Sequence, residues 1–439
     1  MKHKILVSLI LIFAVFAFLR FYNLQNRIIF NWDQEHYAYE IKNIVQNHKL
    51  TLIGPRANND KGFFLGPYFT YLMIPFYLLT NLHPSGSIYF LITYNLVFFV
   101  SAFLITKKIF GAKSALMFLL LWTINNLLVD YDIIPWWPLL IPLGTVLTWK
   151  LLLEKKWLLL GLVLGFFINI HFQFVFLLIY SGIFILIDKQ NRNLTWKKII
   201  LTATGFFLTL LPLIFFDLRH NFLNLKLFIN FFLPGGGQIK SEYFSWIPVF
   251  TNFLQPLTYW KNDIITIIFY LIFAGIVFYL QRNSKKEIKT FYLSFLILWL
   301  IVPLFFAFYG KRPSEYYYVF LYPFILLVTS NFLLKQKKIF IVLALGFLFS
   351  ANFISLKFNL TKANYELLSY KDKIVREIKR TSSSKKVSIV YSVPLGWNNG
   401  FNYLLEYYGM KDEGGPKYEI VIPADQQCKF KAGTIGLKY

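Results

Sequence analysis

The chain has almost no cysteine and few acidic residues. Cys428 is the only cysteine among 439 residues, which excludes an intramolecular disulfide and a cysteine zinc cluster. Asp and Glu total 21 against 45 Lys and Arg, so the formal net charge is +24. The basic residues form short runs between apolar segments, without a basic face that interleaves aromatic residues. We therefore expect no nucleic-acid partner.

A nucleotide phosphate loop is also missing. The glycine-rich stretch at residues 234–238 (PGGGQ) has no Lys-Ser/Thr pair beside it and no strand-to-helix setting, so we interpret it as an ordinary loop. Internal repeats and low-complexity tracts are absent as well. An enzyme with this sequence would have to use a donor that was activated elsewhere.

Apolar residues are abundant instead. Hydrophobic residues make up 57% of the chain, 50 residues are Phe, and the mean hydropathy is +0.53. A water-soluble fold cannot bury this much apolar surface, so we predict an all-α polytopic membrane protein with about 11–12 transmembrane helices. The apolar runs are residues 5–22, 87–106, 113–130, 137–153, 157–170, 172–187, 199–216, 263–281, 291–309, 316–334 and 338–355.

The basic loops predict which side of the membrane each segment faces, because cytoplasmic loops carry the excess of Lys and Arg. Five such loops cover residues 107–113, 155–156, 189–198, 282–289 and 335–338. Placing all five in the cytoplasm requires residues 157–187 to turn at the outer side, near His171. Segment 67–82, about 24 Å long as a helix, is too short to cross and is predicted to be tilted or re-entrant. The uncleaved first helix then starts in the cytoplasm, and the C-terminus lies outside a plasma or inner membrane.

Two parts follow from this pattern. Residues 1–355 are predicted to form the membrane domain, with a first outer loop over 23–66. Residues 356–439 change to a Lys-, Ser- and Gly-containing composition and predict a small soluble α/β domain outside the cell. Its elements are expected as a helix near 363–380, strands near 386–392 and 418–422, and a helix near 398–408.

The first outer loop carries the leading candidate for chemistry. Residues 31–40 (NWDQEHYAYE) place Asp33 just after the first membrane helix. A carboxylate at the interface can meet a lipid-borne headgroup and act as a general base. The alternative is that Asp33 only caps the helix that follows. Glu35 is a candidate acidic partner.

Other polar residues are expected on the same side. The acidic turn 130–138 (DYDIIPWWP) adds Asp130 and Asp132 as candidate partners, although its Trp and Tyr residues are typical interface anchors. His171 lies within an apolar stretch. A lone histidine there is either a satisfied structural group or, at a helix break facing an outer cavity, a binding residue.

Lys and Arg are usually enriched in cytoplasmic loops, so cations predicted on the outer side are candidates for binding an anion. Arg219 and His220 end a helix, where they either hold a phosphate or pair with Asp217. Residues 311–318 (KRPSEYYY) contribute Lys311 and Arg312, which suit either a polyprenyl phosphate or anionic lipid headgroups.

With these segments in this order, the chain resembles the GT-C membrane glycosyltransferases. The resemblance is to glycosyltransferase family 39, which includes protein O-mannosyltransferases and aminoarabinose transferases acting on lipid A, and it covers roughly residues 1–335. It is carried by the early Asp of residues 31–38, the Gly66-Pro67-Tyr68 opening, the turn at 130–138, FDLRHNF at 216–222, and Arg312, Tyr316, Tyr317, Tyr318 and Pro323.

The resemblance implies a polyprenyl-phosphate sugar donor, a site on the outer face and inversion at the anomeric carbon. Asp33 matches the family's catalytic Asp. Some members carry a second acid where this chain has Gln34, and several carry an acid or His where it has Gly66. The implied acceptor is a glycan, a lipid or a protein.

The donor's phosphate or sugar would be bound by cations and polar aromatics of the outer segments. These are Arg56, Lys61, His171, Arg219, His220, Lys311, Arg312 and Tyr317. The lipid phosphate is already a good leaving group, so no metal ligand is assigned. Mg²⁺ or Mn²⁺ stays open as a cofactor.

Two other functions fit parts of the pattern. A flippase or transporter of polyprenyl-linked glycans also has many spans, but it usually spreads charges along a path through its helices and often shows two-fold repeats. A polysaccharide polymerase or ligase shares the donor lipid. It is expected to place paired arginines in a long outer loop, and residues 217–262 contain only Arg219.

Overall fold

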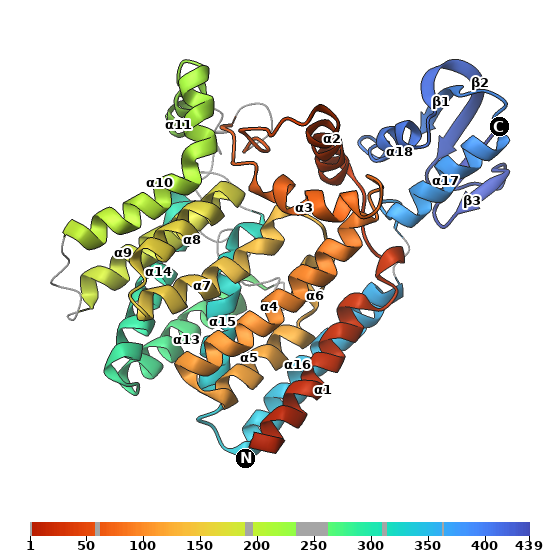
Figure 1. The fold of residues 1–439 in the computed structure, drawn as a ribbon. Helices are drawn as coiled ribbons and strands as arrows, with labels where there is room; N and C mark the ends of the chain where they lie inside the picture. Colours follow the sequence, from red (N-terminus) through yellow and green to blue (C-terminus); the bar gives the residue numbers. More distant parts are fainter. Residues whose placement is uncertain (1, 58–61, 189–195, 234–261, 310–313, 362–363) are drawn as a thin grey trace.

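The computed structural model describes the chain except for residues 1, 58–61, 189–195, 234–261, 310–313 and 362–363. The glycine-rich stretch at 234–238 therefore lies outside the described residues, as do Lys61, Lys311 and Arg312. The described chain forms a helical body that carries a small α/β region at its C-terminal end (Figure 1).

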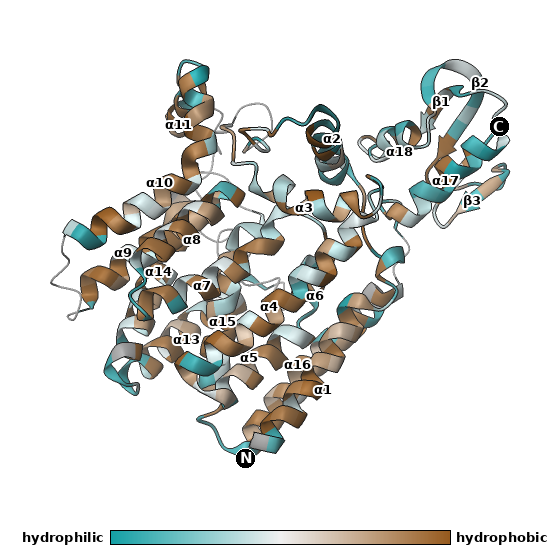
Figure 2. Ribbon diagram, viewed as in Figure 1, coloured by the Kyte–Doolittle hydropathy of each residue, from teal (hydrophilic) through white to brown (hydrophobic). Residues whose placement is uncertain are grey.

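The helical body contains α1 (Lys2–Phe21), α2 (Trp32–Asn47), α3 (Tyr68–Leu78), α4 (Gly86–Phe110), α5 (Ala112–Ile124), α6 (Asn126–Asp132), α7 (Ile141–Leu153), α8 (Trp157–Ile170), α9 (Val175–Ile187), α10 (Trp196–Arg219), α11 (Leu223–Phe232), α13 (Asp263–Arg282), α14 (Lys286–Tyr309), α15 (Tyr322–Leu333) and α16 (Lys338–Thr361). Short 3₁₀ turns cover Leu24–Asn26, Trp137–Leu140, Phe172–Phe174 and Glu315–Leu321. Apolar residues dominate the long helices, whereas α2, α17 (Leu368–Thr381) and α18 (Phe401–Tyr407) are more polar (Figure 2).

All eleven predicted spans coincide with apolar helices. In the described part of the chain, seven are long and apolar enough to cross a membrane by themselves: His3–Asn26, Gly86–Phe110, Trp196–Arg219, Asp263–Arg282, Ile288–Ala307, Glu315–Leu333 and Lys338–Lys357. Helices α5 and α6 form a further pair bent by 78°. The bend lies at Asn125, whose side chain accepts a hydrogen bond from the Leu128 N–H (3.1 Å) and so starts α6 as a new helix. The prediction of a polytopic helical membrane protein is confirmed.

Two irregular segments also follow the sequence pattern. The stretch 157–187 breaks at His171, between α8 and α9, as predicted. Segment 67–82 forms only the 11-residue α3, which contains Pro75 and ends in a turn before α4. At 1.5 Å per residue α3 is about 17 Å long, too short for a ~30 Å hydrocarbon core.

Helices α8 and α10 pack closely because glycines face the opposite backbone. A Cβ atom at Gly161 would lie 2.0 Å from the Thr202 carbonyl oxygen, and one at Gly205 would lie 2.2 Å from the Leu158 carbonyl oxygen. Small residues at four-residue spacing (Gly161 and Gly165) permit such contacts between membrane helices. This pair holds the His171 turn at one end of the bundle.

The C-terminal region adds α17 (Leu368–Thr381), β1 (Lys386–Ser392), α18 (Phe401–Tyr407), β2 (Lys411–Val421), β3 (Phe430–Ala432) and β4 (Ile435–Lys438). The sheet order is β1-β2-β4-β3, with β1 and β2 parallel and the other pairs antiparallel. The predicted helices and both predicted strands are present, while β3 and β4 were not predicted. One hydrophobic cluster continues from the membrane helices into this region, and Figure 1 shows α18 beside α2.

Candidate functional site

The first turn of α2 is capped without Asp33. Asn31 is the N-cap residue, and its backbone N–H donates to Gln34 Oε1 (3.1 Å) in a capping box. Asp33 is therefore not needed as a cap. Its carboxylate forms no hydrogen bond or ion pair with any residue that the structure describes, and only burial and the charge of His36 act on it.

One face of α2 lines a cavity of about 1150 Å³. Asp33, His36, Tyr37 and Glu40 lie on this face at positions i, i+3, i+4 and i+7. His36 Nε2 lies 3.1 Å from Glu40 Oε1, and the Thr70 hydroxyl donates to the other Glu40 oxygen (2.7 Å). Our sequence analysis did not single out His36, Tyr37 or Glu40, although the helical period counted from Asp33 would have found all three.

The cavity brings together four of the residues predicted from the sequence: Asp33, Arg56, His171 and Tyr317. They come from α2, the segment between α2 and α3, the α8–α9 break and the 3₁₀ turn before α15. The remaining lining residues are Trp32, Thr51, residues 53–55, Ala57, residues 63–65, Trp136, Trp137, Phe172, Gln173, Val175, Phe176, Phe231, Phe232, Phe305, Phe306, Ser314 and Tyr316, together with the α2 residues named above. Segments far apart in sequence thus surround the Asp33 carboxylate.

Stacked aromatic rings form one wall of the cavity. The His171 ring lies on Trp137 with centroids 4.2 Å apart and planes 9° apart. Tyr316 packs on Trp136 (5.2 Å) and on Tyr317 (4.7 Å). His171 Nδ1 accepts a hydrogen bond from the Gln173 backbone N–H (3.2 Å), which leaves Nε2 as the nitrogen that can carry the proton of a neutral ring. Flat rings with a few fixed polar groups are typical of small-ligand sites.

A second wall is made of phenylalanine. Phe63 contacts Phe172 (5.3 Å between centroids), Phe228 (4.9 Å) and Phe231 (5.7 Å). Phe172 in turn packs on Phe232 (5.7 Å). The Phe wall therefore makes one end of the cavity strongly apolar.

Arg56 is the described cation that lines the cavity. Its guanidinium lies over the Phe64 ring, 4.9 Å from the centroid, and a backbone bridge joins the same two residues. Arg56 Nε is buried without a hydrogen-bond partner. A buried, unsatisfied guanidinium nitrogen beside a cavity is suited to binding an anion.

The electrostatics of α2 favour proton transfer. Burial raises the pKa of Asp33 above its usual 3.8, and the nearby His36 charge partly opposes that shift. The hydrogen bond to Glu40 raises the pKa of His36. A carboxylate whose pKa is raised toward neutrality, without a protein partner, is a candidate general base.

Three of the predicted acids lie elsewhere. Glu35 is buried and accepts hydrogen bonds from the N–H groups of Gly400 (2.7 Å) and Tyr403 (2.9 Å), so it faces the C-terminal region and not the cavity. Asp132 forms a buried ion pair with Arg20, as described below. Asp130 does not line the cavity, and its charge acts on Arg27.

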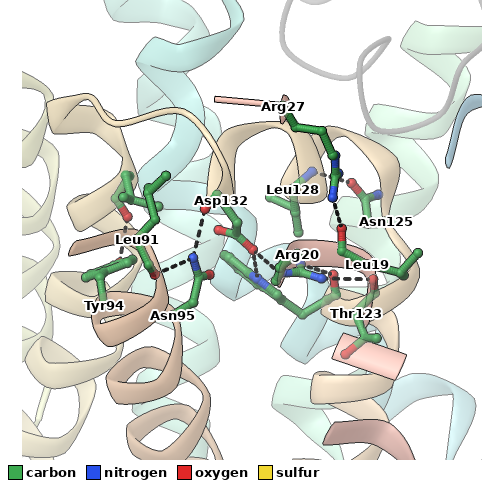
Figure 3. A network of polar contacts seen from close by, with 12 residues as sticks. Leu19, Arg20, Arg27, Leu91, Tyr94, Asn95, Thr123, Asn125, Leu128 and Asp132 are labelled. Atoms are coloured by element: carbon green, nitrogen blue, oxygen red, sulfur yellow. Dashed lines mark hydrogen bonds and ion pairs between the residues drawn. The ribbon is translucent and has the colours of Figure 1, made fainter. Parts of the chain in front are cut away.

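Arg20 and Asp132 tie α1 to α6 within the bundle (Figure 3). Arg20 Nε donates to Asp132 Oδ2 (2.7 Å), and the Trp122 ring N–H donates to the same oxygen (3.1 Å). The remaining Arg20 nitrogens donate to backbone carbonyls, and Asn95 donates to the Asp132 carbonyl (2.8 Å). This arrangement gives Asp132 a structural role.

The FDLRHNF segment is the corner between α10 and α11. Asp217 accepts hydrogen bonds from the N–H groups of Asn224 (2.6 Å) and Leu225 (3.2 Å), so it caps α11. His220 stacks on Phe216 and its Nδ1 lies 2.8 Å from the Phe216 carbonyl oxygen. Arg219 and His220 are exposed and do not line the cavity.

Close packing against α8 explains the glycine at position 66, where several members of glycosyltransferase family 39 carry an acid or His. The Gly66 N–H donates to the Asn169 carbonyl (2.9 Å), and a Cβ atom there would lie 2.2 Å from the Asn169 side-chain oxygen. A larger residue would push the segment before α3 away from α8.

Among the described residues, no group of three or more His, Cys, Asp and Glu side chains is placed to hold a metal ion. The acidic and His side chains that line the cavity are Asp33, His36 and Glu40 of α2 and His171.

Comparisons with known proteins give the fold. No protein-family model matches the chain, and no curated protein matches its sequence. Among solved structures, the chain is similar to ArnT from Cupriavidus metallidurans in the apo state, with a TM-score of 0.63 and 12% identity over 98% of this chain and 97% of that one. The same ArnT bound to undecaprenyl phosphate gives a TM-score of 0.61 at 12% identity, over 98% and 97% of the two chains.

A third similar structure is the Archaeoglobus fulgidus oligosaccharyltransferase tethered with an acceptor peptide. Its TM-score is 0.52 at 12% identity, over 96% of this chain and 69% of that one. These likenesses confirm the resemblance at the level of the fold: the chain has the GT-C glycosyltransferase fold.

Proposed function

We propose that the chain transfers a sugar from a polyprenyl-phosphate-linked donor to an acceptor, with inversion at the anomeric carbon and with Asp33 as the general base. The observation that carries this proposal is the unpartnered, half-buried Asp33 carboxylate on the wall of a 1150 Å³ cavity in a GT-C fold. The similar ArnT structure bound to undecaprenyl phosphate supports a lipid-linked donor. The sequence resemblance to glycosyltransferase family 39 supports the same chemistry.

The cavity has a place for each part of such a donor. The Phe wall, of which Phe63, Phe172, Phe231 and Phe232 line the cavity, suits an isoprenoid chain. Arg56 would hold the phosphate by charge-assisted hydrogen bonds. The sugar would then lie between Asp33 and the aromatic wall of Trp137 and His171.

The acceptor has its own entrance. A second hollow of about 780 Å³ is lined by Glu40, Asn43, Ile44, Asn47, His48, Lys49 and Thr51. It shares Glu40 and Thr51 with the main cavity. We infer that a polar acceptor enters along α2, past Glu40 and Thr51, to reach Asp33. A glycan and a polar peptide both suit this entrance better than a lipid tail.

In the reaction, Asp33 accepts the proton of the acceptor hydroxyl or amine as that group attacks the anomeric carbon. The new bond forms as the bond from the anomeric carbon to the phosphate oxygen breaks, and polyprenyl phosphate leaves with the electron pair. Arg56 stabilises the negative charge that develops on the departing phosphate. The raised pKa of Asp33 makes it a stronger base than an exposed aspartate.

We further propose that the cavity faces the outer side of the plasma or inner membrane, with the N-terminus in the cytoplasm. The five basic loops support this orientation. On the same reasoning the region after residue 356 is extracytoplasmic.

The test is a transfer assay on the purified protein. A panel of polyprenyl-phosphate sugars is offered with glycan and peptide acceptors, and released lipid phosphate is measured with and without a chelator. We expect release from at least one donor, and its sensitivity to the chelator decides whether Mg²⁺ or Mn²⁺ takes part. Movement of the lipid donor across the membrane without release of lipid phosphate would overturn the proposal and favour a transporter.

A further inference from the structure

The segment that leads into Asp33 is held by the C-terminal region. The Phe30 N–H donates to the Glu366 carbonyl (2.8 Å), and the Leu368 N–H donates to the Ile28 carbonyl (3.0 Å). A backbone bridge joins Ile29 to Leu367. Residues 28–30 therefore form a short antiparallel contact with the start of the C-terminal region, only three residues before Asp33.

The first turn of α2 is held from the same side. Asn31, its N-cap residue, donates to the Glu366 carboxylate. Glu35 is 8% exposed, and its two oxygens accept the Gly400 and Tyr403 N–H groups at the start of α18 (2.7 and 2.9 Å). Asp33 thus lies between two residues of α2 that are each bonded to the C-terminal region.

Lys371 closes this contact. It is 0% exposed, and its ammonium donates to the carbonyls of Phe30 (2.8 Å) and Asn399 (2.6 Å). Burial lowers the pKa of Lys371 to about 8, against the opposing effect of the Glu35 charge. Burying an ammonium group is energetically unfavourable unless it is hydrogen-bonded. Lys371 obtains its hydrogen bonds by joining the segment before α2 to the segment before α18.

Gly400 fits tightly against the same carbonyl. Its φ is +87°, and a Cβ atom there would lie 2.3 Å from the Phe30 carbonyl oxygen and 2.9 Å from Lys371 Nζ. Gly396, on the same loop, has a similar φ of +82° and no neighbour within 4 Å of such an atom. Of the two glycines, only Gly400 is buried and touches the segment that carries Asp33.

We propose that the C-terminal region is a positioning device for the general base, in which Glu35, Lys371 and Gly400 set the first turn of α2 so that the Asp33 carboxylate faces the cavity. The inference rests on the proposed function of Asp33 and deepens it. These three residues do not line the cavity, so their effect on the reaction passes through α2.

The sharpest test is the pair Gly400→Ala and Gly396→Ala. Both changes carry the same backbone penalty for a positive φ, but only the first presses on Phe30. We expect G400A to lower kcat about 10- to 100-fold, as expected for a catalytic group displaced by about 1 Å, while KM changes by less than about threefold. G396A should retain the kcat of the unmodified protein. A folded G400A with unchanged kcat would overturn the proposal.

A second set of variants serves if G400A fails to fold. Lys371→Met removes the ammonium, and Lys373→Met, an exposed position on the same helix, is its control. Glu35→Gln keeps the shape of the side chain but turns one acceptor into a donor facing the Gly400 N–H. We expect lower kcat at nearly constant KM for K371M and E35Q, and no change for K373M. Equal kcat in all three would contradict the proposal.

Hydrogen exchange at the Phe30 amide separates this inference from the proposed function. We expect faster exchange in G400A, K371M and E35Q than in the unmodified protein, G396A and K373M. If the unmodified protein transfers no sugar from any donor, the proposed function fails while exchange still reports the contact. If sugar is transferred but the Phe30 amide exchanges equally in all variants, the positioning role fails alone.

Discussion

Asp33 and Asp132 are both carboxylates at the end of a helix, yet their surroundings differ completely. Asp132 is 4% exposed and bonded to Arg20 and to the Trp122 ring, with the Arg20 nitrogen 2.7 Å away. Asp33 has no partner among the described residues and lines a large cavity. A partnered buried charge stabilises the fold only as part of its pair, whereas an unpartnered one carries an electrostatic cost that is commonly tolerated where chemistry takes place.

The difference separates acidic residues that are hydrogen-bonded within the protein from Asp33, which is not bonded to any described residue. Glu35 and Asp217 resemble Asp132, because each is bonded to backbone or side-chain donors. Asp33 stands apart. Exchanging each acid for its neutral counterpart should therefore separate loss of activity from loss of stability.

The largest effect is expected for Asp33→Asn. Removal of a general base commonly lowers the rate about 10²- to 10⁴-fold. Because Asp33 has no protein partner to lose, the free energy of unfolding should not fall. Turnover and thermal unfolding measured on the same detergent-solubilised sample check both parts. A normal rate in a folded D33N protein would remove Asp33 from the reaction.

Asp132→Leu should show the opposite pattern. It leaves the Arg20 guanidinium buried without its carboxylate, and breaking a buried pair in this way costs about 3–5 kcal/mol of unfolding free energy. Combining it with Arg20→Met removes both charges and should recover much of that loss. Chemical unfolding of the single and double variants measures the difference. If D132L is as stable as the unmodified protein, the contrast between the two acids is lost.

Arg56→Met should reduce kcat about 10²-fold, because it removes a donor that stabilises the departing phosphate. Arg219→Met is the matched control, since Arg219 is exposed and outside the cavity. Initial rates at saturating donor compare the two. Equal losses of kcat in both variants would contradict the assignment of Arg56 as the cation that stabilises the departing phosphate.

The smallest effect is a shift in pH dependence. The acid limb of kcat/KM reports the pKa of the general base in the free enzyme, which must be deprotonated to act. The charge of His36 lowers the pKa of Asp33, so His36→Asn should move the acid limb to higher pH by less than about one unit. A pH–rate profile from about pH 4 to 8 measures it. A shift to lower pH would contradict the electrostatic assignment.

The sequence predicted the fold well, because local patterns carry it. Each of the eleven apolar runs coincides with helices in the described part of the chain, the polar residues around His171 marked the α8–α9 break, and alternation in the tail identified β1 and part of β2. The bend at Asn125 was not foreseen, since a cap inside an apolar run looks like any other Asn. Strands β3 and β4 were too short to show a pattern.

The site could be predicted only where one segment carries it. Asp33 was predicted from its place after α1 and lines the cavity, and the helical period would have added His36, Tyr37 and Glu40 to the residues that line it. Partners that lie far apart in sequence could not be found: Arg20 and Asp132 are 112 positions apart, and Glu35 and Gly400 are 365 apart. Because those contacts could not be foreseen, Glu35 and Asp132 were predicted as acidic partners of Asp33.

The most direct test of the central claim is the reactivity of a cysteine at position 33. Cys428→Ser removes the single native cysteine, so Asp33→Cys in that background gives one defined thiol. We expect a membrane-impermeant maleimide to label this thiol from outside intact cells, and polyprenyl phosphate added to membranes to slow the labelling. Labelling from the cytoplasmic side alone, or at a rate that polyprenyl phosphate does not change, would contradict the claim that this position meets a lipid-linked donor on the outer face.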